Sequence, residues 1–275
     1  MTTALDTFLT ESRREIDRHL DALLPLADAA PAILHEAMRY AVFSGGKRLR
    51  PALAFATARA CGAEPARVLP IAAAVELLHS YSLVHDDLPA MDDDDERRGL
   101  PTVHVKFGEA LAVLAGDALL TESFAVLAQA GARSEVAAAL GRSTGSLGLV
   151  GGQVDDLGLT PERTSFDAIV SIHRRKTAAL FEAAVVGAAH LCDGPPAQIE
   201  RLRRYAQAYG LAFQASDDLL DEGRKETSLL QVLDAAAVRR YIARHAATAV
   251  ASLETFGSAA AQLRMLAEAL EERLV

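Results

Sequence analysis

The stretch from Glu76 to Arg98 constrains the fold more than any other part of the sequence. It begins as an apolar run with helical spacing and ends in six aspartates, which two arginines closely follow. His79 and Asp86 are seven residues apart and lie on one face of the predicted helix. Pro89 ends this helix, so that Asp92 can fold back toward Asp86. Carboxylates held together repel one another unless a cation lies among them, and hard oxygen ligands predict Mg2+.

The alternative is a solvated acidic loop at a helix end, which would be the better interpretation of this segment alone. A second acidic cluster weighs against it. Gln214, Asp217, Asp218 and Asp221 follow one another at i, i+3, i+4 and i+7, and form one polar stripe at the end of another apolar helix. Two such stripes are hard to explain by solvation, so we expect both to bind metal.

The composition favours closely packed helices. Hydrophobic residues make up 51% of the 275 residues, whereas aromatic residues make up 5% and Trp is absent. The core must therefore be built mainly from Ala, Leu and Val. The sequence has no β alternation of useful length, no linker and no internal repeat. It predicts an all-α fold that forms a single domain over residues 1–275.

Charge and cysteine usage exclude several classes of protein. The formal charge of −9, from 28 basic and 37 acidic residues, would repel a nucleic-acid backbone and an anionic membrane. Cys61 and Cys192 lack the spacing of a zinc site or a disulfide framework. The first residues contain no signal-peptide core, and no run of eighteen uncharged apolar residues follows. We expect a cytoplasmic protein that binds no nucleic acid and does not insert stably into a membrane.

A cationic turn precedes the acidic helix. Three cations fall within four residues in the motif Gly45–Pro51, directly after two glycines and at the start of a helix. A basic surface turn is one interpretation of this run. However, backbone freed by Gly45 and Gly46 beside the fixed cations Lys47 and Arg50 is also suited to wrapping a phosphate.

A further cationic motif lies on a later helix. His173, Lys176 and Thr177 share one face, which would let Lys176 point into a core cavity rather than into solvent. Two other segments are predicted to be packed helices and not sites. Residues 109–130 form an apolar run typical of a buried helix, and residues 143–158 are rich in glycine but lack the strand and spacing of a nucleotide loop.

Together these groups indicate a class of chemistry. If the two acidic stripes face one cavity, they would bind Mg2+, and the cations would hold two multiply charged phosphates. Those cations are Lys47, Arg50, Arg97, Arg98 and Lys176. A metal that bridges a diphosphate neutralises the charge that develops as the diphosphate departs. Apolar helices suit a hydrocarbon and would protect a carbocation from water. The spacing leads as far as Mg-dependent chemistry on an organic diphosphate.

These motifs resemble the trans-isoprenyl diphosphate synthases, and most closely the bacterial farnesyl diphosphate synthases. The likeness extends over residues 45–51, 86–92, 97–99, 151–155, 173–177 and 213–221. It implies a homodimer whose subunits are single-domain helical bundles of the isoprenoid-synthase type around a central cavity. The implied activity is condensation of isopentenyl diphosphate with dimethylallyl or geranyl diphosphate to give farnesyl diphosphate, by ionisation, addition and proton loss.

The resemblance also implies roles for individual residues. Mg2+ would be ligated by Asp86, Asp92 and Asp217, with help from Asp87, Asp218 and Asp221. The allylic diphosphate would be held by Arg97 and Lys176, and isopentenyl diphosphate by the turn at Gly46 with Lys47, Arg50, His79 and Arg98. Thr177 and Gln214 would face the cation. The departing diphosphate is the expected base.

Two positions bear on how far the resemblance extends. After Asp221 a loop usual in the family is missing, so Lys225 is expected to carry more of the binding of the allylic diphosphate. Tyr81 lies five residues before Asp86, about one and a half turns deeper on the helix. In the family a bulky aromatic residue here resembles a floor that stops the product at fifteen carbons. The alternative is that Tyr81 only packs in the core.

Three other functions are consistent with parts of the pattern. A terpene cyclase also ionises an allylic diphosphate, but it needs no second diphosphate site, which Gly45–Pro51 and Arg98 argue for. A non-catalytic subunit of a prenyl synthase would explain the missing loop, but has no need of both acidic stripes. A geranylgeranyl or other short-chain prenyl diphosphate synthase would differ only in product length.

Overall fold

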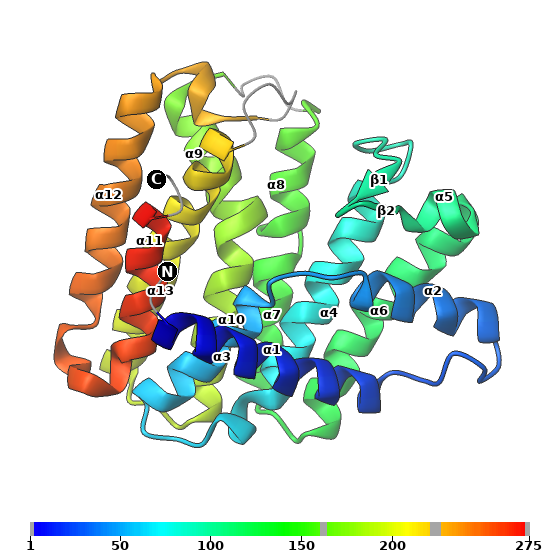
Figure 1. The fold of residues 1–275 in the computed structure, drawn as a ribbon, viewed down its shortest axis with the longest axis horizontal. Helices are drawn as coiled ribbons and strands as arrows, with labels where there is room; N and C mark the ends of the chain where they lie inside the picture. The colour runs from blue at the N-terminus through cyan, green and yellow to red at the C-terminus, as the bar shows by residue number, and fades with distance from the viewer. Residues whose placement is uncertain (1–2, 160–163, 221–226, 273–275) are drawn as a thin grey trace. The chain divides into compact units, whose positions relative to one another are not determined.

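The computed structural model describes residues 3–159, 164–220 and 227–272. Helices make up most of this part of the chain (Figure 1), which confirms the all-α prediction. The helices are α1 (Thr3–Leu23), α2 (Ala32–Phe43), α3 (Leu49–Ala60), η1 (Pro65–Val68), α4 (Leu69–Asp86), α5 (Val103–Phe107), α6 (Glu109–Gln129), α7 (Ser134–Thr144), α8 (Leu149–Asp156), α9 (Phe166–Ile172), η2 (His173–Ala178), α10 (Ala179–Leu191), α11 (Pro196–Leu220), η3 (Leu229–Gln231), α12 (Ala235–Ser252), η4 (Glu254–Ala260) and α13 (Ala261–Glu272). Two short antiparallel strands, β1 (Glu96–Arg97) and β2 (Leu100–Pro101), pair after α4.

The chain divides into two compact units. Unit 1 contains Met1–Phe8, Leu53–Val68 and Arg133–Val275, and unit 2 contains Leu9–Ala52 and Leu69–Ala132. The acidic end of α4 and the cationic turn before α3 therefore belong to unit 2. The basic motif at residues 173–177 and the acidic end of α11 belong to unit 1. A single domain over residues 1–275 stays a prediction.

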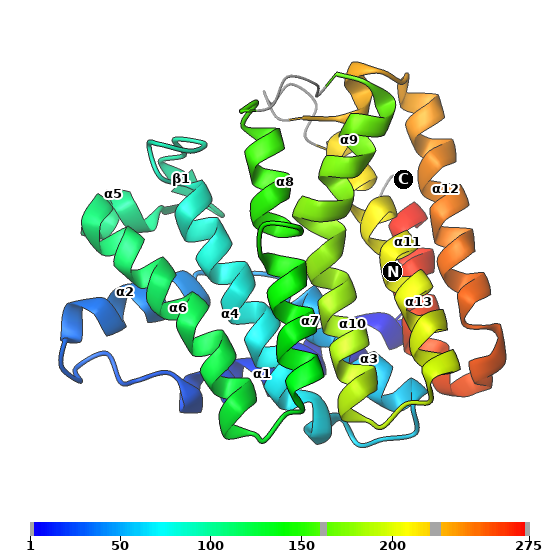
Figure 2. The ribbon, with the colours of Figure 1, turned by 180° about the vertical axis from the view of Figure 1, so that it is seen from behind.

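Unit 2 is built on α4 and α6, which run side by side in both views (Figures 1 and 2). Small residues let the two helices approach closely. A Cβ atom at Gly116 of α6 would overlap the imidazole ring of His85 on α4. His85 Nε2 lies 3.1 Å from the Val113 carbonyl oxygen. On α4, Leu77 and Leu78 are fully buried. This packing holds the helix that carries His79 and the first aspartates.

The prediction that residues 109–130 form a buried helix is wrong for one face of α6. Leu114 is 55% exposed and Val113 is 40% exposed, and the Asp117 side chain is 61% exposed. A helix that is apolar all round can be covered by its own chain or can leave one face open, and hydrophobicity does not distinguish the two.

Among the residues that the structure describes, two helical stretches are long and apolar enough to cross a membrane by length and composition alone. They are Pro65–Asp86, which is 72% buried over its most apolar window, and α6, which is 39% buried. Core helices of proteins that never enter a membrane pass the same test. Each stretch contains carboxylate residues away from its ends, Glu76 in the first and Asp117 and Glu122 in the second. The absence of membrane insertion and the cytoplasmic location stay predictions.

Unit 1 is built around α11, which packs against α10 and α12 (Figure 2). A cluster of aromatic rings fills the centre of this packing. The Phe181 ring of α10 meets the rings of Tyr209 and Phe213 of α11 edge-on, with centroids 5.3 and 5.0 Å away. Further along α11, a Cβ atom at Gly210 would come within 2.5 Å of the Cβ atom of Ala178. This close approach fixes the segment at 173–178 against the helix that ends in the second acidic cluster.

The helix predicted from Ser165 onward is present but is not uniform. The Ser165 side chain caps α9 by accepting a hydrogen bond from the Ala168 amide at 3.2 Å. The chain then passes through a π-helical segment, η2, into α10. The predicted close packing of residues 143–158 is confirmed at Gly152, where a Cβ atom would lie 2.5 Å from the Lys176 amide nitrogen. The segment is, however, divided into α7 and α8 by a turn at 145–148.

Candidate active site

The end of α4 folds back as the sequence predicts. The helix ends at Asp86. The amide of Asp92 then donates to the Asp86 carbonyl oxygen at 2.9 Å, and the amide of Asp94 donates to the Asp87 carbonyl oxygen at 3.2 Å. These bonds satisfy carbonyl groups that the helix leaves open at its C-terminus. They bring Asp86, Asp87 and Asp92 together at one helix end.

Asp87 and Arg97 form a half-buried ion pair in this loop. Arg97 Nε donates to Asp87 Oδ1 at 2.7 Å, and its Nη2 lies 3.5 Å from Asp94 Oδ2. Burial raises the pKa of the Asp87 carboxyl group, although the Arg97 guanidinium opposes the rise. Asp87, the predicted auxiliary metal ligand, is therefore engaged by Arg97, the predicted ligand of the allylic diphosphate. The contact orients the guanidinium and leaves part of its donor fork open.

A group of cations surrounds His79. Burial, and then the charges of Arg50, Arg98, Arg48 and Arg97, hold the pKa of His79 well below its ordinary value. The imidazole is therefore neutral near pH 7 and can donate or accept one hydrogen bond within a strongly positive environment. Such an environment favours a multiply charged anion.

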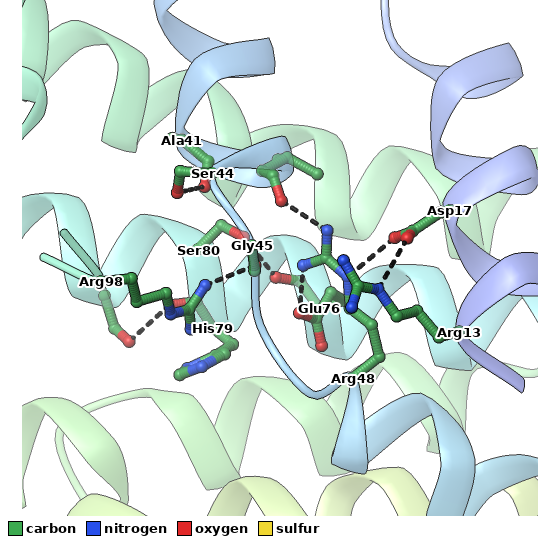
Figure 3. A network of polar contacts seen from close by, with 12 residues as sticks. Arg13, Asp17, Ala41, Ser44, Gly45, Arg48, Glu76, His79, Ser80 and Arg98 are labelled. Atoms are coloured by element: carbon green, nitrogen blue, oxygen red, sulfur yellow. Dashed lines mark hydrogen bonds and ion pairs between the residues drawn. The ribbon is translucent and has the colours of Figure 1, made fainter. Parts of the chain in front are cut away.

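The glycine turn lies against this cationic group. Arg98 Nη1 donates to the Gly45 carbonyl oxygen at 2.5 Å. Gly46 has φ of 123°, and a Cβ atom there would lie 2.8 Å from Arg98 Nη1, so only glycine fits. Lys47 is exposed in the same turn. Thus the residues predicted to bind isopentenyl diphosphate all belong to unit 2, and Figure 3 shows Arg98 and His79 next to one another beside Gly45.

In unit 1 the basic motif of η2 is paired with α8. Lys176 Nζ donates to Asp156 Oδ2 at 2.5 Å, and the Lys176 side chain is 24% exposed. Arg175 pairs with Asp155 in the same way. Lys176 is therefore turned from open solvent, as predicted, but a carboxylate holds it there. Asp156 could not be assigned to the site from the sequence, although it lies three residues after Gln153 on one face of α8.

Gln153 provides a test of whether this region fits a polar ligand. The residue is 6% exposed, and in the described part of the chain neither its amide nitrogen nor its amide oxygen has a hydrogen-bond partner. Buried amide groups are almost always hydrogen-bonded, so an orphaned pair indicates a bound water or ligand group. Gln153 follows Gly152, which packs on the backbone of Lys176. The residues present thus fit a polar or charged group near η2.

A chain of hydrogen bonds connects η2 to the acidic end of α11. Thr177 Oγ1 donates to Gln214 Oε1 at 2.7 Å, and Gln214 Nε2 donates to Asp218 Oδ1 at 3.2 Å. The Leu229 amide donates to Asp218 Oδ2 at 2.7 Å, and His173 Nε2 lies 3.7 Å from the same oxygen. Thr177 and Gln214, predicted to act as a pair, are brought together. Asp218, predicted as an auxiliary metal ligand, has both oxygens engaged by protein donors.

The donor set is consistent with a metal that is shared with a substrate. Within residues 3–159, 164–220 and 227–272, no group of three or more His, Cys, Asp or Glu side chains is close enough to hold a metal ion alone. Mg2+ usually takes only one or two carboxylates from a protein and completes its shell with water and substrate phosphate. The assignment of Asp86, Asp92 and Asp217 as ligands stays a prediction. Asp221 and Lys225, which the sequence also predicts for the site, lie outside the described residues.

Tyr81 is buried on α4, with 5% of its surface exposed. Its ring meets the His85 ring edge-on at 5.7 Å between centroids. Burial, and then the charge of Asp86, raise the pKa of the Tyr81 hydroxyl to about 12, so the phenol is neutral. An apolar ring with a neutral hydroxyl suits either a packing residue or the floor of a hydrocarbon cavity. The role as a floor stays a prediction.

Comparison with known proteins shows relatives of the same fold over most of this chain. The polyprenyl synthetase family profile matches residues 31–234. Farnesyl diphosphate synthase of Bacillus subtilis is 43% identical over 234 residues, which cover 82% of this chain and 79% of that protein. Large subunit 1 of the chloroplastic heterodimeric geranylgeranyl pyrophosphate synthase of Arabidopsis thaliana is 44% identical, over 78% of this chain and 60% of that protein. The apo crystal structure of an FPP/GFPP synthase from Zymomonas mobilis has a TM-score of 0.91 at 37% identity, covering 98% of this chain and 99% of that one.

Proposed function

The chain belongs to the polyprenyl synthetase family, and from this premise we propose that it condenses isopentenyl diphosphate with dimethylallyl or geranyl diphosphate to give farnesyl diphosphate. At a coarser level it is a short-chain trans-prenyl diphosphate synthase, a prenyltransferase. The observation that supports a second diphosphate substrate is the cationic turn beside His79, where Arg98 Nη1 donates to the Gly45 carbonyl oxygen and the charges of Arg50 and Arg98 help to lower the pKa of His79. A terpene cyclase needs only one diphosphate and would have no use for this second anion site.

Different residues would bind each of the two diphosphates. Arg97, oriented by Asp87, and Lys176, oriented by Asp156, would hold the allylic diphosphate. Lys47, Arg50, Arg98 and the neutral His79 would hold isopentenyl diphosphate through charge-assisted hydrogen bonds. Mg2+, held by Asp86, Asp92 and Asp217, would neutralise the charge that develops on the leaving diphosphate.

The chain's own polar groups would then act on the carbocation. Thr177 donates its hydroxyl proton to Gln214. The remaining lone pairs of both oxygens are therefore available to stabilise a nearby positive charge. Apolar walls would keep water away until the new carbon–carbon bond forms. A proton is then lost to the departed diphosphate, which the resemblance implies is the base.

Product length distinguishes the proposal from a geranylgeranyl diphosphate synthase. Relatives of both names match the chain with similar identity, 43% for the Bacillus enzyme and 44% for the Arabidopsis subunit. Tyr81 favours fifteen carbons, because a buried ring one and a half turns from Asp86 would block further growth of a chain that extends along α4.

The exposed apolar face of α6 supports a homodimer. Leu114 is 55% exposed and Val113 40%, and Val105 of the neighbouring α5 is 49% exposed. A face of this kind on two adjacent helices is typical of a surface that a second copy covers. Leu114→Asp should therefore yield a monomer by light scattering, whereas Leu26→Asp, at a residue 67% exposed in the loop after α1, should leave the assembly unchanged.

The decisive experiment is an assay of the purified protein with Mg2+, isopentenyl diphosphate and each allylic substrate in turn. Products are separated by chain length. We expect farnesyl diphosphate from both substrates, and a loss of activity when a chelator removes the metal. Asp86→Ala and Asp217→Ala should each lower kcat by about 100-fold or more, because the leaving charge loses its metal. Asp28→Ala, at an exposed carboxylate in the loop after α1, is the control.

The outcomes separate the alternatives. No turnover with any substrate pair would favour the non-catalytic subunit. Turnover of an allylic diphosphate without isopentenyl diphosphate would favour a cyclase. Substantial activity in Asp217→Ala would refute the expectation that both acidic clusters serve the same chemical step.

A further inference from the structure

Arg48, the middle cation of the turn Gly45–Arg50, points inward. It is 5% exposed, whereas its neighbour Lys47 is exposed. Its backbone has φ of 51°, a conformation that costs free energy in a residue with a Cβ atom. Burying a charge costs more free energy still. Such an arrangement persists only where specific contacts offset both costs.

Those contacts come from three helices (Figure 3). Arg48 Nε donates to Asp17 Oδ1 of α1 at 2.8 Å, and Nη2 donates to the Val42 carbonyl oxygen near the end of α2 at 2.6 Å. Nη1 donates to Glu76 Oε1 of α4 at 2.6 Å. The planar guanidinium can meet three acceptors in fixed directions, which a lysine ammonium on a flexible stem cannot reproduce. Arg48 therefore joins the turn to α1, α2 and α4 at once.

Glu76 links this contact to the anion site. It is 3% exposed and lies one helical turn before His79 on α4. In the part of the chain that the structure describes, Arg48 is the one cation within ion-pair distance of Glu76. In Figure 3, His79 and Arg98 lie on one side of the turn, and Arg48 and Asp17 lie on the other. The turn is thus fixed from both sides.

We infer that Arg48 is a positioning residue that ties the turn to α4 through Glu76. This contact keeps Lys47 and Arg50 in a fixed position and orientation relative to His79. It thereby determines the affinity of the protein for isopentenyl diphosphate. Arg48 itself touches no substrate. This inference rests on the proposed function, because it assigns the turn to that substrate.

The test separates positioning from plain stabilisation. Replacing a buried ion pair by apolar residues of similar volume often preserves stability. The double variant Arg48→Met with Glu76→Leu should therefore fold, as circular dichroism and denaturant unfolding will show, yet lack the directional tie. Arg48→Lys keeps the positive charge beside Glu76 but loses the planar guanidinium group that donates in three fixed directions. Arg13→Met is the control, since Arg13 contacts the same Asp17 at 3.5 Å without reaching Glu76.

The measurement is equilibrium dialysis of radiolabelled isopentenyl diphosphate without an allylic substrate, so that no turnover is needed. We expect the dissociation constant to rise on the order of tenfold in the double variant and less in Arg48→Lys, because small displacements of oriented cations weaken binding steeply. In the steady-state assay, KM for the allylic substrate should stay within about twofold of wild type, because the residues proposed to hold that diphosphate, Arg97 and Lys176, are not part of the turn.

Each result distinguishes a positioning role of Arg48 from a purely stabilising one. A folded double variant that binds as tightly as wild type would show that Arg48 only stabilises the fold, and would overturn the inference. An equal rise in KM for both substrates would overturn it too. If the double variant does not fold, Arg48→Lys decides by the same criteria. A wild-type protein that binds no isopentenyl diphosphate refutes the proposed function instead.

Discussion

Asp218 offers a sharp test of what the second acidic cluster does. The sequence predicts it as an auxiliary metal ligand, but its two oxygens accept hydrogen bonds from Gln214 Nε2 and the Leu229 amide at 3.2 and 2.7 Å. Leu229 is fully buried and Asp218 is 7% exposed. A carboxylate used in this way anchors the chain after the cluster to α11. We expect Asp218 to act as an anchor and Asp217 as the ligand.

The magnitude follows from the contacts. A hydrogen bond to a charged acceptor contributes about 1.5–3 kcal/mol, and Asp218→Ala would leave the buried Leu229 amide and the part-buried Gln214 amide group without one. Relief of the buried charge offsets part of this loss. We therefore expect Asp218→Ala to lower the free energy of unfolding by about 2–4 kcal/mol, measured by guanidinium unfolding. Asp28→Ala, at an exposed position in the loop after α1, should change it by less than about 0.5 kcal/mol.

Asp218→Asn should behave differently from the alanine variant. Its amide oxygen can still accept from the Leu229 amide. If Gln214 turns over, its oxygen accepts from the new amide group and its nitrogen donates to Thr177 Oγ1. The same pairs of groups then stay hydrogen-bonded, but donor and acceptor exchange roles between Thr177 and Gln214 and between Gln214 and residue 218. The loss in the free energy of unfolding should therefore stay below about 1.5 kcal/mol.

The activity of the same variant completes the test. Reversing the Thr177–Gln214 bond changes which lone pairs face the cation, so kcat of Asp218→Asn should fall by no more than about tenfold. The Mg2+ concentration for half-maximal rate should not change. An Asp218→Asn protein of normal stability whose activity falls as far as that of Asp217→Asn, and recovers at high Mg2+, would refute the anchor and restore the ligand assignment.

Four further predictions follow from single positions. Tyr81→Ala should shift the product to twenty carbons or more if the ring is a floor, and an active variant with unchanged products would show that it is not. Lys47→Ala should raise KM for isopentenyl diphosphate by about tenfold or more with little change for the allylic substrate, and equal effects on both would contradict the assignment. Gly152→Ala should cost about 1–3 kcal/mol of stability, because its Cβ atom would lie 2.5 Å from the Lys176 amide nitrogen, and this is measured by denaturant unfolding. Burial, and then two nearby arginines, lower the pKa of His245 from 6.5 to about 4 in the folded protein. As pH falls, the unfolded chain therefore binds a proton at this histidine before the folded protein does, and the free energy of unfolding decreases between about pH 6.5 and about pH 4. His245→Gln should reduce that slope, and an unchanged slope would contradict the shift.

Much of the fold could be predicted because helix ends are encoded locally. Pro89 cannot continue α4, so the helix ends at Asp86 as expected. Gly257 separates the last helices with a backbone conformation of φ 56°. Ser165 caps α9 through a residue three positions away. Each of these signals involves groups within a few residues, so the sequence alone contains both partners of the interaction.

The face of each polar residue on its helix could also be predicted. Periodicity of 3.6 residues places Gln214 one turn before Asp218 on α11. It also identifies the acidic end of α4. The polar stripes and the residue types therefore follow from the sequence by itself, as does the all-α architecture, because these depend on local spacing and on propensity.

Which partner lies opposite each side chain was decided only by tertiary packing. Of the three cations in the turn, Arg48 turns inward because Asp17 and Glu76, 31 and 28 residues away, supply its acceptors. Lys176 is held by Asp156, 20 residues earlier, and not left in an open cavity. The position of a residue in the helical repeat determines on which face of its helix the side chain lies. It does not determine how far away the facing helix lies or which charges that helix carries. That information exists only after the core has packed, and it determines which charges bind substrate and which hold the chain in place.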